Sequence, residues 1–255
     1  MEPLLRFFVD NFPSGELLLY GVPASLAYGA LALAVAAFLK RRFEWKTGYS
    51  RKTFHFLVFG GACFAHTRFG TPAVCLYGGM VSLIVLFAIL KGAGHAGYDA
   101  LARDKDAPYA TYYIIVPWAA TAVGGILANA YLGRYAVIGY LVGGIADAIA
   151  EPVGTRWGRH RYRPPFGGLV ESERSLEGSL SVALAAILAT SLGLWLIGDI
   201  QLDGASAGIV ILIAILSALV EAISPHGWDN LTMQFVPAFL ASWLFPLVGF
   251  VTNGA

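Results

Sequence analysis

Charged residues are scarce in this sequence, and their scarcity excludes an ordinary soluble domain. Only 13% of the 255 residues are charged, whereas 57% are hydrophobic. A soluble domain carries about 25% charged residues. The formal net charge is +1, so bulk electrostatics give no support to nucleic-acid binding. The composition predicts an integral membrane protein.

Several familiar signatures are also missing. The two cysteines, Cys63 and Cys75, lie in apolar runs and have no spacing typical of a metal site or a disulfide framework. The sequence contains no Walker A motif and no kinase glycine-rich loop, so neither identifies a nucleotide. It shows no strong repeat and no dividing linker. We therefore expect a single integral-membrane domain over residues 1–255.

Long apolar runs dominate the sequence instead. A transmembrane helix needs about 20 mostly apolar residues. We therefore expect an all-α, polytopic transmembrane helical bundle of about eight spans. The expected spans are 17–39, 54–66, 71–90, 109–128, 135–153, 178–198, 205–222 and 232–251. The second span is short because Arg68 ends it early, so it is expected to be either tilted or re-entrant.

The basic residues predict the orientation of these spans. Fourteen of the 17 Lys and Arg residues fall in loops that eight spans would place on one side. Only Arg6, Arg68 and Arg134 fall on the opposite side. Since cytoplasmic loops carry an excess of Lys and Arg, the basic side should be cytoplasmic and both termini should lie outside.

Two acidic residues lie near the end of the fifth apolar run. Asp147 and Glu151 are four residues apart, so on a helix their carboxylates share one face. Two bare carboxylates in hydrocarbon are costly to bury, and a bound cation would remove that cost. Magnesium typically takes one or two carboxylates together with substrate phosphates. The alternative is a structural pair that bonds neighbouring helices or Arg156.

Anion-binding patterns follow in the next loop. Arginine suits phosphate because its guanidinium group binds phosphate through two hydrogen bonds. The loop contains Arg156, Arg159, Arg161 and Arg163, and then Arg174. Gly178 and Ser179 open the next apolar run, where a helix N-terminus would direct free backbone N–H groups at the loop. The alternatives are a topology signal touching anionic lipid, and ordinary capping by Ser179.

Two more polar motifs flank apolar runs on the same side. Arg51 and His55, with Lys52 between them, are four residues apart and would point the same way on a helix. Asp229 and Asn230 lie between the last two spans and offer oxygen ligands, although adjacent Asp and Asn are also common in turns. All these motifs are expected to meet at one membrane face.

Taken in order, these motifs resemble those of the polyprenol kinase family, which includes dolichol, phytol and farnesol kinases. They are Arg51-Lys-x-x-His55, Asp147-x-x-Ala-Glu151-x-Val-Gly154-x-x-x-Gly158, Arg174-Ser-x-Glu177-Gly-Ser179 and Asp229-Asn230. The resemblance covers residues 51 to 237. Relatives commonly have Lys at the position of Arg174 and Asp at that of Glu151. Both replacements keep the charge of the side chain but change its length.

The resemblance implies a multi-pass enzyme that phosphorylates a lipid alcohol, typically from CTP, in the presence of Mg²⁺. It implies that the metal is held by Asp147 and Glu151 with Asp229 nearby. The implied nucleotide and phosphate site contains Arg51, Lys52, Arg174, Glu177, Gly178, Ser179 and Asn230. Asp229 or His55 would accept the hydroxyl proton. The sequence leaves the alcohol, the oligomeric state and the choice between CTP and ATP open.

Two other functions stay in view. The family is related to the CTP-dependent phosphatidate cytidylyltransferases, and His226-Gly-Trp-Asp229 faintly resembles one of their motifs. The chain lacks their long Ser-x-x-Lys-Arg…Lys-Asp run, which puts CDP-lipid synthesis second. A proton-coupled transporter would also suit intramembrane acids and a helix broken at Pro152, but it would place the acids near the midplane.

Overall fold

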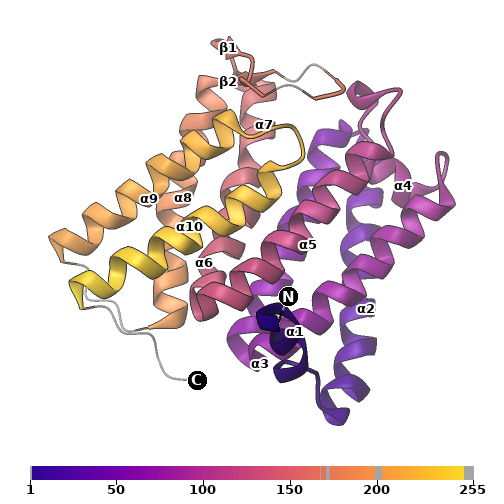
Figure 1. Cartoon of the computed structure of the whole chain (residues 1–255). Helices are drawn as coiled ribbons and strands as arrows, with labels where there is room; N and C mark the ends of the chain where they lie inside the picture. Colours follow the sequence, from indigo (N-terminus) through magenta and orange to yellow (C-terminus); the bar gives the residue numbers. More distant parts are fainter. Residues whose placement is uncertain (1, 167, 171–172, 199–202, 250–255) are drawn as a thin grey trace.

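The computed structural model describes residues 2–166, 168–170, 173–198 and 203–249, and it is an all-α bundle (Figure 1). Its helices are α1 (Glu2–Asp10), α2 (Gly15–Phe43), α3 (Thr47–Lys91), α4 (Ala96–Leu101), α5 (Tyr112–Leu132), α6 (Ala136–Leu141), α7 (Asp147–Trp157), α8 (Leu176–Ile197), α9 (Gly204–Ile223) and α10 (Asp229–Leu244). Short 3₁₀ turns cover Asp104–Asp106, Gly133–Tyr135 and Phe245–Val248, and a π-helical turn covers Val142–Ala146. Strands β1 (Arg161–Tyr162) and β2 (Arg174–Ser175) pair antiparallel.

Six described helical segments are long and apolar enough to cross a membrane, so the expected class is confirmed but the expected count of eight is not. These segments are Gly15–Phe43, Thr47–Lys91, Tyr112–Trp157, Leu176–Ile197, Gly204–Ile223 and Asp229–Val248. Two of them, of 45 and 46 residues, each combine two of the expected spans. The expected end of the last span, at residues 250 and 251, lies outside the described residues.

Helix α3 folds back on itself at Gly70. Gly70 adopts φ 79°, a left-handed conformation that glycine reaches without strain, and Pro72 follows it. The Tyr77 hydroxyl donates a hydrogen bond to the Val58 carbonyl at 2.9 Å. In a straight helix these residues would be roughly 28 Å apart, so the two halves of α3 lie side by side. The expectation that Arg68 ends a short segment is wrong, because the helix continues through Arg68 to the bend.

The core is centred on α6, all six residues of which are buried. Glycines allow its neighbours to approach closely. A Cβ atom on Gly139 would lie 2.1 Å from the Gln234 carbonyl oxygen of α10, and one on Gly193 of α8 would lie 2.7 Å from the Ile138 side chain. Small residues at such crossings are typical of membrane helix packing. This packing brings α8 and α10 against α6 at short range.

One end of the bundle is polar, and we call it the polar end. It carries the start of α3, the loop from α4 to α5, the β1–β2 hairpin with α7, and the α9–α10 connection (Figure 1). The four sequence motifs therefore come from separate parts of the chain to the same end.

Candidate active site

A polar cavity of about 540 Å³ opens at the polar end and gathers most of the motif residues. Seven basic and seven acidic side chains line it. The basic residues are Lys46, Arg51, Lys52, Arg103, Lys105, Arg161 and Arg174, and the acidic ones are Asp104, Asp106, Asp147, Glu151, Glu173, Glu221 and Asp229. Their formal charges balance, so a polyphosphate entering this cavity would need additional positive charge.

Asp147 lies at the centre of one ion-pair group in this cavity. The Lys52 ammonium nitrogen is 2.7 Å from its Oδ2 atom, and the His55 Nε2 atom is 3.3 Å from the same oxygen. Both Lys52 and Asp147 are buried. Asp147 follows the π-helical turn Val142–Ala146, a distortion that often occurs at functional sites. The His55 Nε2 atom also lies 2.8 Å from the Gly143 carbonyl oxygen in that turn.

Arg174 lies at the centre of a second group. One of its terminal nitrogens is 2.7 Å from Glu221, and the other is 3.4 Å from Asp229. The same side chain donates to the Ser224 carbonyl at 3.1 Å. Burial alone would lower the pKa of Arg174, but the two carboxylates outweigh burial and raise it. One guanidinium group thus connects β2 to α9 and α10.

Arg103 forms a third group, which the sequence analysis missed. Its side chain is 5% exposed, and it holds the Asp106 carboxylate through two nitrogens at 2.8 and 2.9 Å. It also pairs with Glu151 at 3.1 Å and hydrogen-bonds His226. Lys105 lies 2.8 Å from Glu151, so two cations already neutralise that carboxylate. The available sequence signal was the run of four charged residues from Arg103 to Asp106.

The loss of folding stability at acidic pH should depend on this third group. Burial alone would raise the pKa of the Asp106 carboxyl, but hydrogen bonds from His226 and Arg103 outweigh it and lower the pKa from 3.8 to about 2. A carboxyl group whose pKa is lowered in the folded state stabilises the protein at pH values above its ordinary pKa. That stability is lost as the pH falls. We expect the unfolding temperature in detergent to decrease between pH 3.8 and about 2.

The matched variant is Asp106→Asn, which has no carboxyl to titrate. It should start less stable at neutral pH and lose less stability than the unmodified chain over the same pH range. An identical decrease in unfolding temperature in both proteins would show that Asp106 does not contribute to the loss of stability at acidic pH.

The start of α8 lines the cavity, but through different atoms from those expected. Ser175, rather than Ser179, caps the helix by accepting from the Gly178 amide at 3.1 Å. Ser179 also lines the cavity, and its hydroxyl lies 2.7 Å from the Tyr162 hydroxyl. Glu177 is not among the cavity-lining residues, because its carboxylate lies 2.7 Å from His160 on the outer face.

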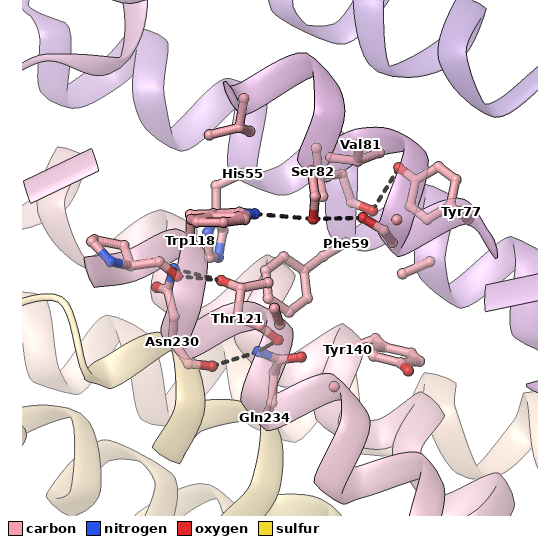
Figure 2. Close-up of a pocket in the computed structure, with 18 of the residues that line it drawn as sticks. His55, Phe59, Tyr77, Val81, Ser82, Trp118, Thr121, Tyr140, Asn230 and Gln234 are labelled. Atoms are coloured by element: carbon pink, nitrogen blue, oxygen red, sulfur yellow. Dashed lines mark hydrogen bonds between the residues drawn. The ribbon is translucent and has the colours of Figure 1, made fainter. Parts of the chain in front are cut away.

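Asn230 also lies elsewhere than expected. Its amide donates to the Pro117 carbonyl at 3.1 Å and to the Thr121 hydroxyl at 2.9 Å, which ties α10 to α5. It lines a second, apolar cavity of about 360 Å³ between α3, α5 and α10 (Figure 2). Arg51 lines both cavities, and His55 lines the apolar one. The two cavities therefore adjoin where α3 begins.

The described residues contain no ready-made group of three or more His, Cys, Asp or Glu side chains for a metal. Asp147 and Asp229 both line the polar cavity, and each contacts basic side chains through its Oδ2 atom. Two carboxylates of this kind fit magnesium when phosphate oxygens complete its shell. Glu151 fits less well because Arg103 contacts both of its carboxylate oxygens, at 3.1 and 3.3 Å, and Lys105 contacts one of them.

Comparison with known proteins identifies a relative of this chain. Over 120 residues the chain is 40% identical to a protein of Synechocystis sp. named phytol kinase. The match covers 47% of this chain and 48% of that protein, so it spans about half the length of each. No family model and no solved structure matches the chain. The relative supports a likeness to phytol kinases and, more broadly, to lipid-alcohol kinases.

Proposed function

We propose that this chain is a membrane-embedded kinase that transfers a phosphoryl group from a nucleoside triphosphate to the hydroxyl of a lipid alcohol. The observation that carries the proposal is the pair of adjoining cavities, one highly charged and one apolar, which share Arg51. A phosphate donor suits the first cavity, and an alcohol with a hydrocarbon tail suits the second. The similarity to a protein named phytol kinase supports the same reaction class.

The chemistry follows from the polar cavity. Phosphoryl transfer depends mainly on positioning and on neutralising charge. Arg51, Lys52 and Arg174 would bind the phosphate oxygens, and each would exchange part of its contact with a carboxylate for a contact with phosphate. The new bond joins the alcohol oxygen to the terminal phosphorus, and the bond to the leaving nucleoside diphosphate breaks. His55, beside the apolar cavity, or Asp229, in the polar one, accepts the hydroxyl proton.

We further propose that Asp147 and Asp229 hold Mg²⁺ together with the nucleotide; the balanced charge of the cavity supports a divalent cation beside a polyphosphate. Held there, the metal would supply positive charge that offsets the charge on the phosphates. Glu151, which the motif also suggests as a ligand, would then act mainly by positioning Arg103 and Lys105. CTP is the proposed donor because the motifs resemble those of CTP-using enzymes.

Eight membrane crossings also remain our proposal. The bends at Gly70 and Gly133 would divide the two longest segments into four crossings of about 20 residues each. All fourteen basic residues of the earlier count would then lie at the polar end, which supports a cytoplasmic location for that end. A transporter is disfavoured, because the acids gather at that end rather than at mid-depth.

The fate of the terminal phosphate tests this function against cytidylyltransferase activity. We expect purified protein given γ-labelled CTP, Mg²⁺ and an isoprenoid alcohol to place label in a lipid monophosphate and release CDP. ATP labelled in the same way measures donor preference. A parallel incubation contains phosphatidate; label found only in pyrophosphate, together with a CDP-lipid made from that phosphatidate, would overturn the kinase assignment.

A further inference from the structure

The apolar cavity has a polar inner end, and this end has no role in the proposed chemistry. Asn129 of α5 and Tyr140 of α6 both line the cavity and are 7% and 3% exposed. The Asn129 amide donates to the Gly125 carbonyl at 2.7 Å and to the Tyr140 hydroxyl. Its carbonyl oxygen is buried and has no hydrogen-bond partner among the described residues. A hydrocarbon chain packed against an unpaired polar atom would leave that atom desolvated, at a cost in free energy.

Elsewhere the cavity wall presents mainly carbon. Away from Arg51, polar side chains of this wall bond to the protein: the Trp118 indole donates to the Ser82 hydroxyl at 3.0 Å, and the Tyr77 hydroxyl donates to the Val58 carbonyl. A run of neighbouring aromatic rings follows the wall inward. His55 and Phe59 have ring centroids 4.4 Å apart, and Phe59 and Tyr140 have centroids 6.5 Å apart. Figure 2 shows Phe59 between His55 and Tyr140. The wall therefore suits an alkyl or isoprenoid chain from the Arg51 end to the Asn129 end.

The length of this wall bounds the length of the chain it can hold. On α3 the lining runs from Arg51 to Ala62, roughly 16 Å, and on α5 it runs from Tyr113 to Asn129, roughly 24 Å. An extended chain advances about 1.2 Å per bond, which makes roughly 5 Å per isoprene unit. The cavity therefore has room for about three to five units, whereas a long polyprenol would exceed even the ~30 Å hydrocarbon core.

We propose that the apolar cavity binds the hydrocarbon tail of the alcohol, and that the Asn129–Tyr140 pair at its inner end limits that tail to about four isoprene units. This inference rests on the proposed function and deepens it. It assigns single-chain alcohols of moderate length as substrates, and Asn129 and Tyr140 as residues that determine specificity without touching the reacting atoms.

Gly125 offers the sharpest test because it lies one turn before Asn129 on the same face of α5. A Cβ atom at Gly125 would first meet the Gln234 side chain, at an ordinary 3.6 Å, and Gln234 lines the same cavity. The leucine side chain in Gly125→Leu should fill the cavity beside the last turn before Asn129. The cavity would become shorter by roughly 6 Å, about one isoprene unit. The preferred alcohol should become shorter by one unit, and kcat/KM for a four-unit alcohol should fall by about tenfold or more.

The experiment measures kcat/KM over a graded series of isoprenoid alcohols that includes farnesol, phytol and long polyprenols. Asn129→Ala is the opposite variant and should extend activity to alcohols one unit longer. Gly208→Leu is the matched control, because a Cβ atom there meets nothing within 4 Å and Gly208 lies on α9, outside the cavity. It should keep the length profile of the unmodified chain.

The outcomes separate the two proposals. A length optimum that shifts in Gly125→Leu and not in Gly208→Leu supports the inference. If the unmodified chain phosphorylates alcohols of every length equally well, or if Gly125→Leu folds and keeps the original optimum, the tail assignment is overturned while the kinase assignment stands. If no alcohol is phosphorylated from any nucleotide, both are overturned.

Discussion

Replacement of Asp147 by Asn should abolish phosphorylation and should also destabilise the protein. Asn keeps the shape of the side chain, but its neutral amide is a weaker cation ligand than a carboxylate and cannot neutralise Lys52, whose ammonium lies 2.7 Å from the carboxylate. Loss of a group that acts on developing charge at a preorganised site lowers kcat by about 10²–10³-fold. Leaving a buried charge without its partner destabilises a protein by about 3–5 kcal/mol. The measurements are Mg²⁺-dependent turnover and the unfolding temperature in detergent.

The double variant Lys52→Met, Asp147→Asn separates these two effects. Methionine has a similar length and no charge, so the double variant should recover most of the stability lost in Asp147→Asn. Its activity should stay at background, because both the phosphate contact and the proposed metal ligand are gone. Full activity in either variant would remove Asp147 from the mechanism. Failure of Lys52→Met to restore stability would show that the ion pair is not the source of the loss.

The sequence predicted the fold class well because hydropathy is a property of local segments. Runs of about 20 apolar residues identify helices in lipid, where backbone groups must bond within the segment. It predicted the second segment poorly. Arg68 predicts the end of this segment, yet a charged residue near a helix end can extend its side chain toward the interface while the helix continues. The bend lies two residues further on, at Gly70, where the Gly-Thr-Pro sequence carried the usable signal.

The candidate site shows a similar division. Charged residues in short motifs, such as Lys52 and Asp147, were found because a charge beside an apolar run is conspicuous. Arg103 and Glu221 were not assigned, since their importance comes from partners far away in sequence, and only the packed bundle brings them together. Asn230 was assigned to phosphate from its neighbour Asp229. One helical step of about 100° turns it instead toward α5 and the apolar cavity.

Replacement of Arg103 by Met should give the largest loss of stability among the basic residues that line the polar cavity. Arg103 is 5% exposed and pairs with both Asp106 and Glu151, so its removal leaves a buried and a partly buried carboxylate short of positive charge. Removing one member of such a buried cluster destabilises by about 3–5 kcal/mol. The stability of Arg103→Lys should lie between those of the unmodified chain and Arg103→Met. Lysine keeps the positive charge, but its ammonium group cannot replace the planar guanidinium group that holds one carboxylate and contacts the other.

Arg161→Met provides the matched control in the same cavity. Arg161 pairs with Glu173 at 3.4 Å, but the two side chains are 55% and 48% exposed. Exposed pairs of this kind contribute about 0–1 kcal/mol, so this variant should unfold at nearly the original temperature. Thermal unfolding of all three variants in one detergent checks the order. Equal unfolding temperatures for Arg103→Met and Arg161→Met would show that water solvates the carboxylates of the Arg103 cluster. They would also show that the loop from α4 to α5 does not depend on this cluster for its position.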